Sequence, residues 1–308
     1  MTTQLVDAHF PDVYQSADRI SQEAQKNYLR WTRGRLQLAV LAATSGIFAV
    51  SSRDGTWQEK AASSTALASF VAALLLEIHM LRDKPEDRWY HGRALAESVK
   101  TLTWRYMTAA APFPSSLHPN EARGILYTRV QDLVAASTQY LPGLTVGTTQ
   151  LTTQMEQIRQ QEAEDRKDLY LSLRVRDQEE WYNRKAKFND RNSRKWRFSL
   201  ILFEISGAVA SIAILLDLTG IDIGGAIAAA VAAAGAWLEV KQYDNLSSAY
   251  ALTATELSFV RLAGENVSAT DEDSWSKYVV SAEQAISREH TMWLARRVGM
   301  LAIRRTFE

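Results

Sequence analysis

Hydrophobic residues along this chain gather in four segments that are separated by long polar and charged stretches. A helix rises about 1.5 Å per residue, so about 20 residues are needed to cross roughly 30 Å of hydrocarbon. Three segments reach this length, and the first approaches it if two serines are included. The pattern predicts four membrane-spanning helices at about residues 36–52, 61–81, 198–219 and 221–240.

The last of these segments is the most ambiguous by composition. Seven of its eight residues from Ala228 to Gly235 are Ala or Gly. Alanine is close to neutral for membrane insertion, and a charged residue such as Glu77 or Glu204 costs about 2.5–3.5 kcal/mol at the centre of a spanning helix. Hydropathy alone therefore leaves a soluble helical bundle open. The lack of bulk also predicts that this helix lies among other helices rather than against lipid.

Flanking charge favours the membrane interpretation. Within 15 residues of the open ends of the segments lie 16 Lys and Arg, whereas the short connections inside each pair carry only Arg53 and Lys60. Positive charge gathers on the cytoplasmic side of membrane proteins, which places both termini and the central region in the cytoplasm. Trp31, Trp57, Trp196 and Trp237 lie near the predicted segment ends, as an interfacial aromatic belt would.

The connections within each pair are short, which predicts two helical hairpins in an all-α integral membrane protein. Each hairpin has a charged helix before it and a helix with a glutamate after it, so the layout indicates a tandem duplication. We expect units at 1–115 and 168–308. Between them, residues 116–167 form a linker region with a helix near 120–137 and another from 151 towards 166.

Composition excludes several kinds of chemistry. The chain has no cysteine, and its formal net charge is zero. Disulfides and thiolate metal sites are therefore excluded, and a general nucleic-acid binder is disfavoured. The sequence has no phosphate loop, hydrolase motif or metal-ligand spacing, so we expect no enzymatic activity and no cofactor. The basic run from Arg184 to Arg197 abuts an apolar segment, which favours anionic lipid headgroups over nucleic acid.

Residues 168–308 carry a recurring set of aromatic and charged positions, which are Tyr170, Arg174, Val175, Gln178, Trp181, Tyr182, Lys185, Ala186, Tyr250, Glu256, Trp275, Glu283, Glu289 and Trp293. Through these residues this half resembles a SLATT domain. The first half is similar to another SLATT branch through Trp89, Arg93, Ala94, Glu97, Ser98, Trp104, Arg105, Tyr106, Pro112 and Phe113. The resemblance implies a tandem protein with four membrane helices.

SLATT proteins are bacterial two-transmembrane-helix effectors associated with nucleotidyltransferases and nucleotide sensors. The resemblance therefore implies a homo-oligomer that forms a pore or disrupts the inner membrane in anti-phage defence. Its trigger would be a nucleotide second messenger or a sensor protein. Two alternatives remain at this point: a non-conducting membrane scaffold, and a helical protein-binding module.

Four acidic residues are candidates for a role at the membrane. Glu204 lies about 9 Å into its segment, where copies in an oligomer would form a cation-favouring ring, or where it would bond to a neighbouring helix. Glu77 lies near an interface, which favours snorkelling. Asp217 and Asp222 flank a tight turn and would keep it in water.

Small residues indicate where helices approach closely, within a hairpin or between subunits. The candidates are Gly207, Ser211, Gly224, Gly225, Ala228 and Ala229. On the polar helices, Glu256, Glu283 and Glu289 are more consistent with salt bridges between helices than with catalysis.

Overall fold

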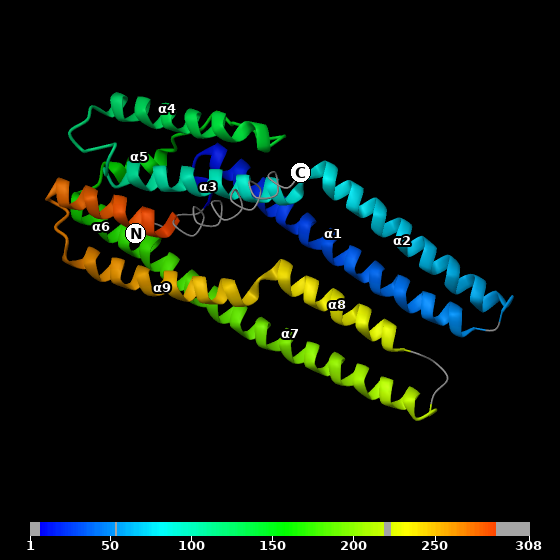
Figure 1. Ribbon diagram of the computed structural model, residues 1–308. Coiled ribbons are helices and arrows are strands. Elements are labelled where there is room, and N and C mark those ends of the chain that lie inside the picture. The colour runs from blue at the N-terminus through cyan, green and yellow to red at the C-terminus, as the bar shows by residue number, and fades with distance from the viewer. Residues whose placement is uncertain (1–6, 53, 219–222, 288–308) are drawn as a thin grey trace, which may run out of the picture. The chain divides into compact units, whose positions relative to one another are not determined.

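The computed structural model describes residues 7–52, 54–218 and 223–287, which contain helices and no strand. The predicted all-α fold is confirmed over this range. In chain order the elements are η1 (Asp7–His9), α1 (Asp12–Ser51), α2 (Trp57–Asp83), α3 (Pro85–Met107), α4 (Pro119–Ser137), η2 (Thr138–Tyr140), α5 (Thr153–Arg159), α6 (Ala163–Tyr170), η3 (Leu171–Arg176), α7 (Asp177–Leu215), α8 (Gly224–Lys241) and α9 (Tyr243–Asn266). A last helix begins at residue 272 and continues to residue 287 (Figure 1).

Four helices are long and apolar enough to cross a membrane, as the pattern predicts. The apolar segments occupy parts of α1, α2, α7 and α8. The charged stretches expected before the first and third segments are not separate helices, because α1 runs for 40 residues and α7 for 39. The hydrogen bonds of a helix join backbone groups, so a change from charged to apolar side chains does not end the helix.

The predicted helix from 151 towards 166 is wrong as a single element, because α5 ends at Arg159 and α6 begins at Ala163. The Arg166 guanidinium stabilises the interruption. It donates to the carbonyl oxygens of Arg159 and Gln161, at 2.9 and 3.1 Å. Carbonyls freed at a helix end need such partners, and a side chain supplies them here.

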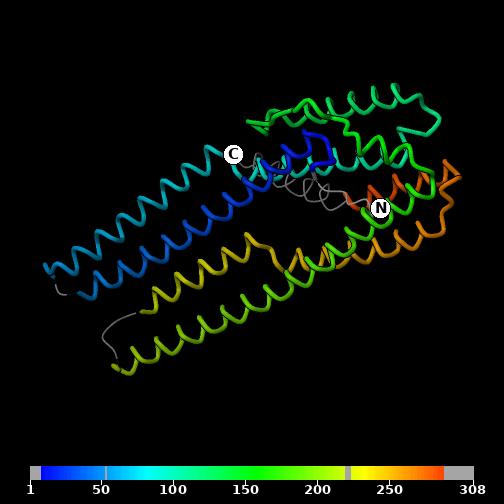
Figure 2. Tube along the Cα trace, turned by 180° about the vertical axis from the view of Figure 1, so that it is seen from behind, coloured from blue at the N-terminus to red at the C-terminus, as the bar shows by residue number. Residues whose placement is uncertain are grey.

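The chain divides into two compact units that are each built from discontinuous segments. Unit 2 comprises residues 25–85 and 187–247, and it holds the four apolar segments. Figures 1 and 2 show α1 beside α2 and α7 beside α8. Near the start of the first pair, the rings of Trp31 and His79 lie 4.3 Å apart.

Unit 1 comprises residues 1–24, 86–186 and 248–308, and the structure describes residues 7–24, 86–186 and 248–287 of it. Its core combines the start of α1 with α3, α4, α5, α6 and the last helix. At its centre Tyr170 contacts the rings of Trp104, Trp275 and Tyr278, with centroids 5.7 to 6.4 Å apart. Edge-to-face contacts of this kind stabilise a core beyond simple burial.

Two helix junctions depart from regular geometry. The six residues of η3 form a π-helix between α6 and α7, an irregularity that often accompanies function. Gln242 separates α8 from α9 with a φ of 47°, in the left-handed region. Close to this bend, the Ser193 hydroxyl lies 2.6 Å from Oδ1 of Asp244, and Arg197 pairs with the same carboxylate.

Candidate functional site

The apolar segments of unit 2 are largely uncovered within a single chain. In the most apolar stretch of each of the four helices, between 6% and 11% of the residues are buried. Large exposed side chains on these helices include Leu41, Phe48, Leu67, Phe70, Leu74, Leu75, Ile201, Leu202, Phe203, Ile205, Val209 and Ile212. An apolar surface of this extent requires lipid or another protein to cover it.

Glu204 lies within this apolar surface on α7. Its neighbours Phe203 and Ile205 are exposed, and so is Glu204 itself. Among the described residues it forms no hydrogen bond and no ion pair. A carboxylate without a partner is costly among lipid-facing side chains, and such residues usually face water or another helix.

Glu77 differs from Glu204 because it has a partner. Its carboxylate accepts a hydrogen bond from Arg35 of α1, and the two side chains are about 40% exposed. Beside this pair, a Cβ atom added to Gly34 would lie 3.6 Å from Leu76. The ion pair therefore joins α1 to α2 at the charged end of the apolar segments.

The predicted small residues have different environments. A Cβ atom added to Gly207 would lie 3.3 Å from Cγ2 of Ile227, so this glycine permits close approach of α7 and α8. A Cβ atom added to Gly225 would lie 3.2 Å from Cδ1 of Ile47, which brings α8 against α1. The Ser211 hydroxyl donates to the Gly207 carbonyl, 2.9 Å away, within its own helix.

The remaining predicted positions in unit 2 differ in exposure. Gly224 is the first residue of α8, Ala228 is exposed and Ala229 is half-buried. Asp217 is exposed beyond the end of α7, with a φ of 56°. Asp222 lies outside the described residues.

In unit 1 the structure brings Arg174 of η3 and Glu283 of the last helix together. Both side chains are 1% exposed. The Arg174 guanidinium donates through Nε and Nη2 to the two carboxylate oxygens, at 3.0 and 2.8 Å. Tyr170 and Thr101 also donate to Glu283, at 3.0 and 2.8 Å. One buried carboxylate thus joins α3, α6, η3 and the last helix.

The surroundings of Arg174 and Tyr170 shift the pKa values of both side chains upwards. Burial lowers the pKa of Arg174, but the attraction and hydrogen bonds of Glu283 outweigh it and raise the pKa above its usual value. Burial raises the pKa of Tyr170 well above its usual value, and the negative charge of Glu283 raises it further. The tyrosine stays neutral and acts as a donor. The four side chains bond to one another across separate helices, which is consistent with a structural role for the network.

Other predicted residues of unit 1 form an aromatic cluster on α7 and α9. Trp181 lies 4.9 Å from the ring of Tyr182 and 5.6 Å from that of Tyr250. The Arg93 guanidinium lies 5.9 Å from the Trp181 ring. Glu256 is half-buried on α9. Glu289 and Trp293 lie outside the described residues.

Sequence reasoning missed the partners of these acidic groups. Arg35 pairs with Glu77 across 42 residues, and Arg174 pairs with Glu283 across 109. For the first pair, the signal in the sequence was the position of Arg35 directly before an apolar segment. For the second pair, it was the presence of Arg174 in the family pattern. Over the described residues, no three His, Asp or Glu side chains form a group that could hold a metal ion.

Two protein-family models match the chain, and together they cover nearly its whole length. Residues 11–167 match the model of SMODS and SLOG-associating 2TM effector domain 3. Residues 170–293 match the model of SMODS and SLOG-associating 2TM effector domain 1. Neither a curated protein nor a solved structure matches the chain. Four apolar helices and two consecutive domain matches lead to one assignment: the chain belongs to the SLATT family and carries two of its two-transmembrane effector domains in tandem.

Proposed function

We propose that this protein is an oligomeric effector of the bacterial inner membrane that opens a cation-favouring pore in defence against phage. The single observation that carries this proposal is Glu204, a carboxylate without a partner within an exposed apolar surface. In a closed oligomer its copies would face a shared aqueous path. Rings of carboxylates favour the passage of cations.

The uncovered surface of α8 supports the oligomer. In α8 only Ala234 is buried, although the Ala- and Gly-rich composition of this helix suits contact with other helices. Small residues let helices approach closely in lipid, where van der Waals packing drives association. A second chain would supply contacts that one chain leaves unmade.

The charge distribution supports the topology. The connection within the first pair carries Arg53 and Lys60, whereas the open ends of the segments hold 16 Lys and Arg. We therefore place both termini and unit 1 in the cytoplasm, with multiple membrane crossings. In this location unit 1 is available to a nucleotide signal or a sensor protein, which we propose as the trigger.

The test is ion flux from liposomes that contain the purified protein, measured together with the ratio of K⁺ to Cl⁻ permeability. We expect Glu204→Gln to reduce this ratio several-fold, because the substitution removes one negative charge per subunit from the path. Glu180→Gln is the matched control. It changes an exposed glutamate on the same helix that pairs with Arg184 in unit 1, and it should leave the ratio unchanged.

Two results would contradict the proposal. A protein that remains in the supernatant after ultracentrifugation without detergent would be a helical binding module instead. A protein that enters liposomes but gives no flux with any activating nucleotide or phage lysate would be a non-conducting scaffold.

A further inference from the structure

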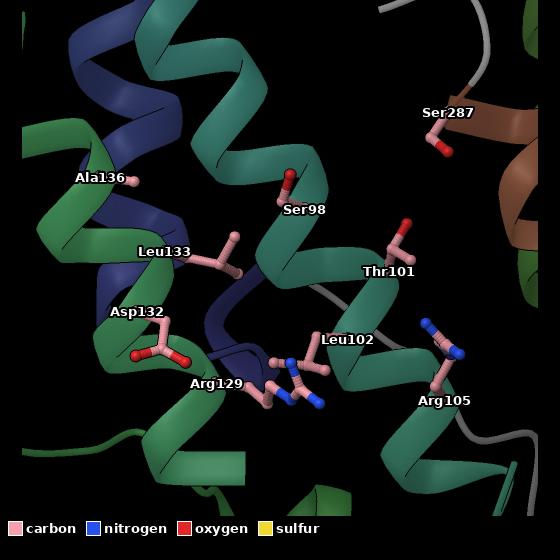
Figure 3. Close-up of a pocket in the computed structure, with 9 residues that line it drawn as sticks. All are labelled: Ser98, Thr101, Leu102, Arg105, Arg129, Asp132, Leu133, Ala136 and Ser287. Carbon is pink, nitrogen blue, oxygen red and sulfur yellow. The ribbon is translucent and has the colours of Figure 1, made fainter. Parts of the chain in front are cut away.

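A cavity of about 400 Å³ lies in unit 1 between α3, α4 and the last helix (Figure 3). Its size falls within the range of small-molecule sites. The lining residues come from three elements: Ser98, Thr101, Leu102 and Arg105 from α3, Arg129, Asp132, Leu133 and Ala136 from α4, and Ser287 from the last helix. Polar side chains thus make up most of its wall.

Two arginines without partners face this cavity. Figure 3 shows Arg129 extending from α4 towards α3, which carries Arg105. Neither side chain forms a hydrogen bond or an ion pair with a described residue. The Nε atom of Arg105 is buried and has no hydrogen-bond partner over this part of the chain. Buried donors are normally satisfied, and an acceptor bound in the cavity would satisfy this one.

The positive charges of Arg105 and Arg129 repel each other. Burial lowers the pKa of Arg105, Glu283 raises it, and Arg129 lowers it. Glu283 is already engaged by Arg174 through two hydrogen bonds. An anion bound between Arg105 and Arg129 would relieve their repulsion and supply the missing acceptor.

The other polar groups narrow the kind of anion. Thr101 and Ser287 already donate their hydroxyl protons, to the Glu283 carboxylate and to the Glu283 carbonyl. The free donors are therefore Arg105, Arg129 and the exposed Ser98. Donors from two helices suit a tetrahedral phosphate, which offers three or four oxygens, better than a planar carboxylate, which offers two.

We propose that this cavity binds a small phosphorylated molecule, with its phosphate held between Arg105 and Arg129. Asp132 lies in the same wall and would repel a bare phosphate, so it selects ligands that place a hydroxyl or amine donor beside it. A volume of about 400 Å³ leaves room for such a group beside the phosphate.

The site also contacts the buried network of unit 1. Thr101 lines the cavity and donates to Glu283, which holds Arg174 of η3. A ligand at Arg105 therefore lies one side chain from the residues that fasten η3, the segment directly before α7. The role of this ligand as the trigger rests on the proposed function, whereas the binding site does not.

Isothermal titration calorimetry of the detergent-solubilised full chain tests the site, with pyrophosphate, ATP and malonate as probes at constant ionic strength. We expect pyrophosphate and ATP to bind, and malonate to bind at least about tenfold more weakly. Arg105→Gln and Arg129→Gln should each weaken pyrophosphate binding by about tenfold or more, because each removes charge-assisted hydrogen bonds. Arg129 is exposed, so its variant tests the site without disturbing the core.

Two further variants sharpen the test. Asp132→Asn should strengthen pyrophosphate binding by about twofold or more, because it removes a repelling carboxylate. Arg184→Gln removes an exposed arginine outside the cavity and should leave affinity unchanged. Absence of pyrophosphate and ATP binding, malonate binding of equal strength, or equal weakening by Arg184→Gln would overturn the site. Absence of liposome flux would overturn the proposed function alone, since this binding assay measures no conductance.

Discussion

The buried ion pair of unit 1 yields a quantitative prediction about stability. Glu283→Gln removes the negative charge that balances Arg174, whose side chain is 1% exposed. Tyr170 and Thr101 donate to different carboxylate oxygens, and the amide keeps one acceptor oxygen, so one of these two hydrogen bonds is lost together with the charge balance. Breaking one half of a buried pair typically costs about 3–5 kcal/mol of unfolding free energy. For a domain of about 150–250 residues this corresponds to a decrease in Tm of about 6–20 °C.

Tryptophan fluorescence during thermal unfolding in detergent measures this loss in unit 1, because Trp104 and Trp275 lie in its core. Asp273→Asn is the matched control, since it removes an exposed carboxylate whose partner Lys277 is also exposed. We expect no measurable change in its Tm. The double variant Arg174→Met with Glu283→Leu should lose less stability than Glu283→Gln, because it leaves no unbalanced buried charge. The reasoning is refuted if Glu283→Gln behaves like the control, or if the double variant is the least stable.

Two further predictions concern unit 2 and the tyrosines of unit 1. Gly225→Leu should lower the unfolding free energy by about 1–3 kcal/mol through overpacking against Ile47. Gly235→Ala, where a Cβ atom meets nothing within 4 Å, should have little effect, and denaturation of both variants in detergent checks this. Stability should also fall above about pH 10. Burial is the main cause that raises the pKa values of Tyr170 and Tyr278 in the folded protein, so folding favours the protonated side chains. The stability that results is complete below the pKa of tyrosine in the unfolded chain, and it is lost as the pH rises above that pKa. Each such tyrosine contributes a slope of up to about 1.4 kcal/mol per pH unit. The part of the phenolate absorbance that a Tyr170→Phe and Tyr278→Phe variant lacks should appear only with unfolding. Its appearance while the tryptophan fluorescence remains native would contradict the argument.

The secondary structure was largely predictable from the sequence. Four apolar segments predict four helices, and the prolines before residue 120 mark the start of α4. This success follows from local physics, since helix hydrogen bonds join residues four positions apart and apolar length is read directly along the chain. The family was also recognisable, because its pattern of aromatic and charged residues is local within each half.

The continuity of α1 and α7 from one unit into the other was not predictable by the same means. A change from charged to apolar composition marks a change of environment, and it does not by itself end a helix. The break between α5 and α6 is the converse case. It depends on hydrogen bonds from the Arg166 guanidinium to the carbonyl oxygens of Arg159 and Gln161. The local pattern of polar and apolar residues does not predict these hydrogen bonds.

The amino-acid sequence alone indicates that this protein is helical, that it has four helices able to cross a membrane, and that it carries one domain type twice. Which acidic residues have partners depends on how the chain folds. Glu77 meets Arg35 and Glu283 meets Arg174, whereas Glu204 stays exposed without a partner over the described residues. The cavity between Arg105 and Arg129 also exists only in the fold. The physical reason is common to all of these: side-chain charge is a property of one residue, but its neutralisation depends on residues that folding brings together from distant parts of the chain.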